Sequence, residues 1–429
     1  MTLTRRTFLG TSAAAVLAAG MMTKGKVFGA NGRIGVCVVG LNGRGGSHYE
    51  AFSKSDRSEV VALCDVDEAV LKEAADIVEK ATGKRPKEFT DIRDALAYSA
   101  IDAVSIATPN HWHSLATILA VQAGKDVYVE KPLSHEVWEG RQLAEAVKKT
   151  GRIVQHGTQS RSDGVWIRDI ALLRSGEIIG PLYMARALCY KRRNAVPVSP
   201  DQEPPANLHW RLWQGPASEK PYNAMYVHYN WHWFWHYGNG DIGNQGVHQM
   251  DIAVWGMNKG LPVKVSSSGG RFTYEDACET PNTQLATFTY ADGTLLQFEV
   301  RGRFTNSEDG VGVGNLFYGQ DGYYVKDKGF FGKDGKLIEL DPAKYPVPDM
   351  PSHFENFLTA VESRKQEDIH GTAEEGHISS AHCHLANVAY RMDRSLQFDP
   401  KTETFKGADD ANALLKRDYH PEFAVPQIA

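Results

Sequence analysis

The chain contains 429 residues, of which 42% are hydrophobic and 23% are charged, and its formal net charge is −5. This length exceeds what one compact core usually holds, so we expect two domains after a targeting segment. The acidic balance provides none of the basic field typical of nucleic-acid-binding proteins, and the five cysteines show no CxxC spacing that would indicate a zinc site or a disulfide framework.

Residues 1–30 have the features of an export signal. A twin arginine, Arg5-Arg6, precedes Phe8-Leu9 and an Ala-rich apolar stretch over 12–22. That stretch is too short and too weakly apolar for a stable membrane span, and no later segment approaches one. We therefore expect a twin-arginine signal peptide over 1–30 and a bacterial protein that is periplasmic or otherwise exported. The alternative is an accidental arginine pair in a leader.

Strand and helix patterns alternate from residue 33 to residue 156. Regular alternation of this kind predicts a parallel sheet with helices on both faces, in which ligands bind beyond the carboxyl ends of the strands. We expect a nucleotide-binding domain over 31–156. The predicted strands are 34–39, 59–64, 102–107, 126–129 and 152–156, and the predicted helices lie near 44–54, 67–82 and 136–150, with another ending near 123.

The turn after the first strand is the most informative motif. Residues 34–46 read IGVCVVGLNGRGG, an apolar run ending in glycines before a helix, where backbone N–H groups can bind a pyrophosphate. Gly40 and Gly45 fit the outer positions of Gly-x-Gly-x-x-Gly, while Asn42, which tolerates positive φ better than most residues, takes the middle one. The cofactor contacts predicted from this turn are Gly40, Asn42, Gly43, Arg44 and Gly45.

A second apolar run, 60–64, ends in Asp65. An acid at the end of the second strand, about 20–25 residues after a glycine turn, binds the ribose hydroxyls of adenosine and would repel a 2′-phosphate. No Arg follows immediately, so Asp65 predicts NAD in preference to NADP. The alternative interpretation is that Asp65 is an N-cap for a helix at 67–80.

Two later strand ends carry polar groups at the same edge of the sheet. Pro132 disfavours helix for Lys131 and keeps it extended, at a strand end where a nicotinamide would bind. There the lysine could bind a substrate hydroxyl or shuttle its proton, and the alternative is a surface ion pair with Glu130. The cofactor contacts predicted from these strand ends are Thr108, Pro109, Asn110, His113, Glu130 and Lys131.

The pattern changes after residue 157. A helix near 162–175 and a strand at 181–191 lead into a long loop, 192–230, rich in Pro, Asn and Trp. Tight turns between later apolar runs indicate antiparallel strands. We expect a second α/β domain over 157–429 with a mostly antiparallel sheet and helices on one face. Its later elements are a helix near 244–257, strands at 262–273, 282–291, 293–304, 313–319 and 322–327, and helices near 351–364 and 372–395.

The helix predicted near 244–257 carries a polar stripe. Asn244, His248, Asp251 and Trp255 recur at helical spacing and share one face. A histidine there can take a proton from a carbinol as hydride leaves, and an ordinary imidazole predicts a pH–rate limb near neutrality. Asn244 would hold the same substrate or orient the ring. The alternative is a core histidine bonded to Asp251.

The segment 226–239 is densely aromatic. Aromatic faces stack on the apolar faces of sugar rings, so Trp235, and Trp213 in the preceding loop, are candidate substrate contacts. A buried aromatic core or a subunit interface is an equal alternative. Three histidines have the spacing of metal ligands on a helix, but the surrounding aromatics and the lack of a second acid argue against a metal site, and we expect none: His228, His232 and His236.

These motifs together resemble those of the Gfo/Idh/MocA family, which includes glucose–fructose oxidoreductase and inositol dehydrogenase. The resemblance spans about residues 33–395. It implies an N-terminal Rossmann domain with a doubly wound parallel sheet, a C-terminal α/β domain with an open antiparallel sheet, and hydride transfer on polyols or sugars. It also implies that Lys131 lies beside the nicotinamide and that His248 is the catalytic acid/base. Asn42 and Asn244 depart from the family pattern, since many members carry Gly and Asp there.

The sequence therefore predicts an exported, NAD-dependent oxidoreductase acting on a sugar, polyol or glycoside. Lys131, His248 and Asn244 are the predicted catalytic and substrate-binding residues, with Trp213 and Trp235 as further substrate contacts. The alternatives are an NAD-dependent glycosidase that oxidises C3 transiently and eliminates the aglycone, and a non-catalytic sugar- or nucleotide-binding protein. The expected partner is a small carbohydrate, with no nucleic acid or membrane. We also expect a homo-oligomer formed through the C-terminal sheet.

Overall fold

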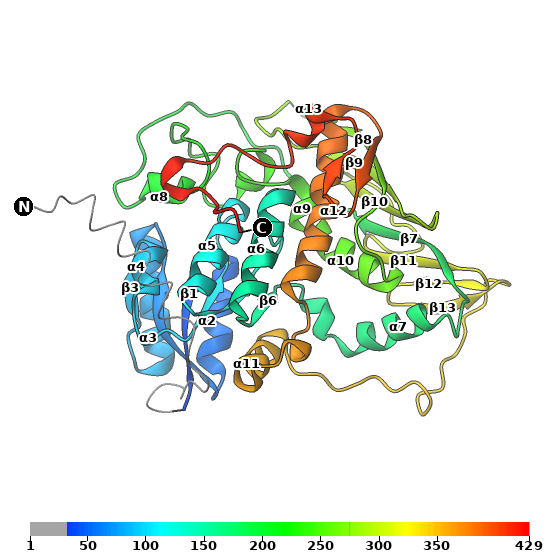
Figure 1. The fold of residues 1–429 in the computed structure, drawn as a ribbon, viewed down its shortest axis with the longest axis horizontal. Helices are drawn as coiled ribbons and strands as arrows, with labels where there is room; N and C mark the ends of the chain where they lie inside the picture. Colours follow the sequence, from blue (N-terminus) through cyan, green and yellow to red (C-terminus); the bar gives the residue numbers. More distant parts are fainter. Residues whose placement is uncertain (1–31, 274, 429) are drawn as a thin grey trace, which may run out of the picture.

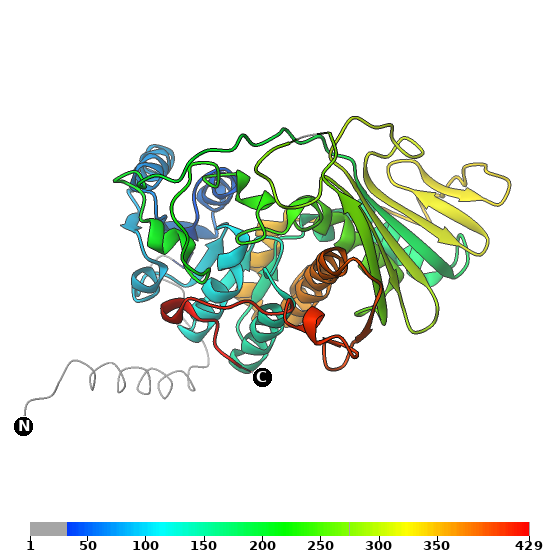
Figure 2. The ribbon, with the colours of Figure 1, turned by 90° about the horizontal axis from the view of Figure 1, so that it is seen from above.

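Two β-sheets organise the computed structural model, which describes residues 32–273 and 275–428 (Figure 1). Helices α10 (Gly246–Met257) and α12 (Ala373–Met392) lie between the two sheets, as the view from above also shows (Figure 2). The fold class predicted from the sequence, α/β with a doubly wound parallel sheet and a second, mostly antiparallel sheet, is confirmed. The predicted signal peptide, 1–30, lies outside the described residues.

The N-terminal sheet is parallel, with the order β3-β2-β1-β4-β5-β6 among the described residues. The order reverses between β1 and β4, and a ligand crevice opens beyond the carboxyl ends of strands at such a point. Its strands are β1 (Ile34–Val39), β2 (Ser58–Cys64), β3 (Lys87–Phe89), β4 (Ala103–Ile106), β5 (Asp126–Val129) and β6 (Val154–His156). Its helices are α2 (Arg44–Lys54), α3 (Glu68–Thr82), α4 (Ile92–Leu96), α5 (Asn110–Gln122) and α6 (Val137–Thr150).

The C-terminal sheet has the order β13-β12-β11-β7-β10-β9-β8-β14-β15. Its pairs are antiparallel except for β7 and β10, which run parallel. Burial alternates along β9 and β10 because one face packs on α7 (Gly164–Ser175), α10 and α12. The strands are β7 (Leu182–Cys189), β8 (Lys264–Gly270), β9 (Thr283–Thr289), β10 (Leu295–Arg301), β11 (Val313–Gly319), β12 (Gly322–Val325), β13 (Gly329–Gly332), β14 (Leu396–Asp399) and β15 (Thr404–Phe405).

The helix predicted over 244–257 is broken near its start. Gln245 separates α9 (Gly240–Asn244) from α10. Asn244 therefore ends one helix while His248 lies in the first turn of the next. The backbone of Gln245 stays helical, with φ −78° and ψ −39°, and its N–H donates to the Asp241 carbonyl oxygen, so the helical spacing behind the predicted stripe continues across the break.

Two segments from the end of the chain return to the N-terminal sheet. Phe357 and Val361 of α11 (His353–Ser363) share a buried cluster with Ile34 of β1. The ring of Phe423 packs edge-on against Trp112 of α5. Side chains from beyond the predicted boundary at 156/157 thus complete the core of the N-terminal sheet. Over the described residues, none of the helices combines the length and apolar character needed to span a bilayer.

Candidate active site at the carboxyl edge of the parallel sheet

A cavity of about 590 Å³ opens beyond the carboxyl ends of the parallel strands. Both domains supply its walls. The N-terminal walls include Gly40, Asn42, Gly43, Arg44, Asp65, Thr108, Pro109, Asn110, His113, Glu130 and Lys131. The C-terminal walls include Trp213, His228, Tyr229, Trp231, His232 and Asn244. Most of the residues predicted to contact a cofactor thus surround one space; Gly45 lies behind it.

The glycine turn has the geometry that a pyrophosphate requires. Gly40 has a φ of 80°, and a Cβ there would lie 2.7 Å from the Thr108 nitrogen. A Cβ at Gly45 would lie 2.0 Å from the carbonyl oxygen of Gly40. Gly43, with a φ of 64°, precedes α2, whose first turn has no capping side chain, so its N–H groups are open to an anion. Positive φ falls on Gly40 and Gly43, so the tolerance of Asn42 for positive φ is not used.

Asp65 braces this turn as well as lining the cavity. Its Oδ2 accepts from the Leu41 N–H at 2.7 Å, and its Oδ1 accepts from the Asp67 N–H at 2.9 Å. The N-cap of α3 is Asp67, which accepts from the Ala69 N–H. The alternative interpretation of Asp65 as the N-cap of this helix is therefore wrong, because Asp67 is the N-cap. Burial raises the pKa of Asp65 above its usual value.

Thr108 offers an independent sign of a polar ligand. Its Oγ1 is buried and lacks a hydrogen-bond partner among the described residues, although buried polar atoms are nearly always paired. The ring nitrogens of His113 lie 2.6 Å from the Pro132 carbonyl oxygen and 2.7 Å from that of Thr108. His113 thus holds the two strand ends together, and Asn110 donates to Asn239 in the second domain. The residues present fit a dinucleotide.

Lys131 joins the two domains inside the cavity. Its Nζ donates to the Asn244 carbonyl oxygen at 2.9 Å and to Asn244 Oδ1 at 3.3 Å. Burial lowers the pKa of Lys131, against the opposing charge of Glu130. Glu130 itself accepts from Arg44 at 2.8 Å, and its Oε1 lies 3.2 Å from His48. The alternative of a surface ion pair between Lys131 and Glu130 does not match this arrangement.

His248 lies one turn beyond Asn244 and outside the side chains that line the cavity. Its ring forms no hydrogen bond with any of the described residues and is half-buried. Burial, and next the charge of Lys131, lower the pKa of His248 to about 3. The two carboxylates that could replace it as a base are both held by arginines: Arg193 bonds Asp241 at 2.6 Å, and Arg161 bonds Asp251 at 2.8 Å.

The aromatic segment divides between the cavity wall and the core. Trp213 is buried, stacks on Trp210 with ring centroids 4.8 Å apart and lines the cavity. The structure does not bring Trp235 to the cavity; its ring lies beside Tyr390 and under Arg391 of α12. This separation corrects the predicted pairing of the two tryptophans.

The three histidines of this segment each have a separate partner. His228 lies 3.1 Å from Asp67, His232 stacks on Trp231 with centroids 3.6 Å apart, and His236 bonds the Ser218 carbonyl oxygen. Within 32–273 and 275–428, no group of three His, Cys, Asp or Glu residues has metal-binding geometry.

The contact between the loop around Asn207 and the segment just after Asp65 was not predicted. The Glu68 N–H donates to the Asn207 carbonyl oxygen at 2.9 Å, and the His209 N–H donates to the Val66 carbonyl oxygen at 2.9 Å. Asn207 also donates from its side chain to Asp67 at 2.7 Å. The long loop rich in Pro, Asn and Trp was the available signal, but its composition does not reveal which surface it covers.

Family models and known proteins are similar to this chain in both domains. A model described as "Oxidoreductase family, NAD-binding Rossmann fold" matches residues 34–158, and one described as "Oxidoreductase family, C-terminal alpha/beta domain" matches residues 196–425. A Glycosyl hydrolase family 109 protein of Shewanella baltica is 32% identical over 132 residues, 29% of this chain and 29% of its own length. Glycosyl hydrolase family 109 protein 1 of Akkermansia muciniphila is 29% identical over 171 residues, 38% of this chain and 35% of its own length.

Solved structures share the fold across nearly the whole described chain. The WlbA dehydrogenase of Bordetella pertussis, in complex with NADH and UDP-GlcNAcA, superposes with a TM-score of 0.64 at 20% identity, covering 86% of this chain and 99% of that one. A putative myo-inositol dehydrogenase of Sinorhizobium meliloti superposes with a TM-score of 0.57 at 18% identity, covering 85% and 99%. At these identities the likeness establishes the architecture.

Proposed function

The chain belongs to the Gfo/Idh/MocA oxidoreductase family, and from that premise we propose that it transfers a hydride between NAD and a secondary hydroxyl of a sugar, polyol or glycoside. The observation that carries the proposal is the contact between Lys131 and Asn244. It joins the two domains at the wall of a cavity that also contains the glycine turn and Asp65.

Three site residues have separate proposed roles at the substrate hydroxyl. When bound, the nicotinamide supplies the hydride acceptor or donor. Neutral His248 takes the hydroxyl proton, since its lowered pKa keeps the imidazole unprotonated at neutral pH. Lys131 donates a hydrogen bond to the same oxygen and stabilises negative charge there. Asn244 holds the Lys131 ammonium in place through two acceptors.

A redox-neutral glycosidase is the second candidate. The names of the curated relatives from Shewanella and Akkermansia favour it. In that cycle, oxidation at C3 would acidify the neighbouring C–H, the aglycone would be eliminated, water would add across the resulting C1–C2 double bond, and the hydride would return to C3. We propose to mix the purified protein with a panel of sugars and aryl glycosides and follow the absorbance of reduced nicotinamide. A lasting rise supports net oxidation; released aglycone without a rise supports the glycosidase; neither signal with any substrate contradicts both.

Asp65 supports a preference for NAD. Asp65→Ser combined with Val66→Arg should shift the ratio of the Kd values for NADP and NAD toward NADP by at least about tenfold, or 1.4 kcal/mol, because an acid that repels the 2′-phosphate is replaced by a cation. Nucleotide titration measured by intrinsic fluorescence gives both constants. Val66→Arg alone is the matched control and should shift the ratio less. Wild-type protein that binds NADP more tightly than NAD would contradict this interpretation of the acid.

The twin arginine supports export from a bacterial cytoplasm. Changing Arg5 and Arg6 to Lys should leave the folded precursor in the cytoplasm, because the translocase recognises the arginine pair. Cell fractionation with immunoblotting measures the distribution. Undiminished periplasmic protein in this variant, or in cells lacking the twin-arginine translocase, would refute export by this route.

The face of the C-terminal sheet turned away from α10 and α12 supports a homo-oligomer. Tyr183 and Leu285 on this sheet are 54% and 42% exposed. A second copy of the chain covering this face would bury them.

A further inference from the structure

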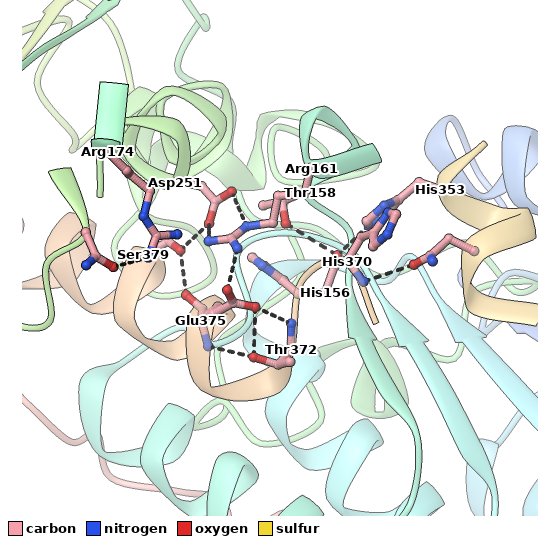
Figure 3. Close-up of polar contacts among 12 residues, drawn as sticks. His156, Thr158, Arg161, Arg174, Asp251, His353, His370, Thr372, Glu375 and Ser379 are labelled. Atoms are coloured by element: carbon pink, nitrogen blue, oxygen red, sulfur yellow. Dashed lines mark hydrogen bonds and ion pairs between the residues drawn. The ribbon is translucent and has the colours of Figure 1, made fainter. Parts of the chain in front are cut away.

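A buried ionic cluster joins Asp251 of α10 to Arg161, Glu375 and Ser379 (Figure 3). Arg161 is 6% exposed and Asp251 is 1% exposed. The guanidinium grips the carboxylate with two bonds, Nε to Oδ2 at 2.8 Å and Nη2 to Oδ1 at 3.0 Å. The hydroxyl of Ser379 lies 2.6 Å from the same Oδ1. Donors engage both oxygens of Asp251, so this carboxylate is a fixed anchor and not a free base.

The two partners come from different elements of the fold. Arg161 belongs to η1 (Gln159–Ser162), which directly follows β6, and β6 pairs with β5 at Val129↔His156. Lys131 stands two residues beyond Val129, so Arg161 and Lys131 belong to the same sheet edge. Asp251 lies on α10, three residues after His248. The ion pair therefore fixes the helix of one proposed catalytic residue against the sheet of the other.

Arg161 is itself held in place from the other side. Its Nη1 bonds Glu375 at 2.6 Å, and Glu375 forms the capping box of α12 with Thr372. The guanidinium also lies 5.1 Å from the ring centroid of Trp255. The neighbouring His156 contributes no such tie, since both of its ring nitrogens are buried without a hydrogen-bond partner among the described residues.

Burying charges costs free energy that hydrophobic packing would avoid, so a bidentate pair at this depth is better explained by the geometry it imposes. We propose that Arg161 is a positioning residue that, acting through Asp251, sets where α10 holds His248 relative to Lys131. The proposal rests on the proposed function, because it gives His248 and Lys131 their roles.

The test compares Arg161→Gln, Asp251→Asn and the double variant. Each single change should lower kcat by about 10- to 100-fold, since small displacements of a catalytic group have effects of this size. The Kd for NAD should stay within about twofold, because neither residue lines the cavity. The double variant should be no slower than the slower single variant, since the two residues act as one unit. Arg161→Lys keeps the positive charge but cannot form the two parallel hydrogen bonds to Asp251, so its kcat should lie between those of Arg161→Gln and the wild type.

A second readout needs no turnover. The imidazole NMR signal of His248, assigned by its absence in His248→Asn, should move or broaden in Arg161→Gln because the ring is held less uniquely. Arg174→Gln is the matched control. Arg174 also bonds α10, at Asn258 at its far end, through an exposed contact of 2.5 Å, and its loss should change neither kcat nor the signal.

The outcomes separate the two proposals. Full kcat together with an unmoved His248 signal in a folded Arg161→Gln would overturn the positioning role. Losses that simply add in the double variant would overturn it as well. If Arg161→Gln does not fold, Ser379→Ala removes one contact to Asp251 and should slow kcat and move the same signal; no change in either overturns the role. A His248→Asn protein with full activity would exclude His248 as the base, and a wild-type protein that acts on none of the substrates would refute the proposed function; in either case the NMR comparison would still decide the positioning.

Discussion

Replacing His248 with Asn should slow single-turnover reduction of bound NAD by about 10²–10⁴-fold, the usual contribution of a positioned acid/base. The ring forms no hydrogen bond that its loss would break, so thermal stability and NAD binding should change little. Rapid mixing of substrate with NAD-loaded protein measures the step directly. His420→Asn, which alters a histidine paired with Glu219 at the surface, is the matched control and should keep the wild-type rate.

The pH dependence follows from the burial of His248. A pKa lowered to about 3 keeps the imidazole neutral throughout the neutral range, so its protonation produces no limb between about pH 6 and pH 8. The ordinary limb near neutrality expected from the sequence overlooks burial and the nearby Lys131. Lys131→Met should slow the same step and also weaken substrate binding, since the variant lacks the only ammonium bonded to Asn244 among the described residues. Reduction of NAD at the wild-type rate in His248→Asn would exclude the histidine as the base.

Acid should destabilise this protein steeply. Six histidines have a pKa lowered mainly by burial, to about 3 or 4, against about 6.5 in an unfolded chain. Below about pH 6.5 the unfolded state binds protons that the folded state cannot, so stability falls as the pH falls. Each histidine contributes up to about 1.4 kcal/mol per pH unit, against a total stability of about 5–15 kcal/mol. They are His156, His232, His248, His353, His382 and His384.

Two carboxyls oppose this trend. Burial raises the pKa of Glu136 to about 7 and that of Glu139 to about 8, so these groups bind protons in the folded state first and add stability as the pH falls toward about 4.5. The histidines outnumber them, so the free energy of unfolding in urea should drop by several kcal/mol, on the order of the total stability, between pH 7 and pH 5. His382→Gln should reduce the slope of the free energy of unfolding against pH by about 1.4 kcal/mol per pH unit, which corresponds to one proton. A free energy that stays constant over this range would refute the expectation.

Local sequence pattern predicted most of the longer strands and helices of both domains and missed the short elements β3, α4, β13, β14 and β15. Strand ends such as Asp65 and Lys131 could be placed because parallel strands bring their carboxyl ends to one edge. The parallel pairing of β7 with β10 could not be predicted, since partner and direction depend on contacts between segments more than a hundred residues apart.

Within the site, the sequence did not reveal which way a side chain points or which residues far apart along the chain contact each other. Trp213 and Trp235 look alike in composition, yet one lines the cavity and the other faces α12. The ion pair of Arg161 with Asp251 joins residues 90 positions apart, and no local spacing connects them. The engagement of Asn244 by Lys131 likewise appears only when the two domains meet.

The packing of α11 and of Phe423 onto the N-terminal sheet determines when this protein can fold. The buried cluster around Ile34 includes Phe357 and Val361, and the one around Trp112 includes Phe423. The domain that is synthesised first therefore cannot complete its core until Phe357, Val361 and Phe423 have left the ribosome. Until then, the apolar surface of the unfinished parallel sheet depends on whatever protects exposed apolar surface in the cell.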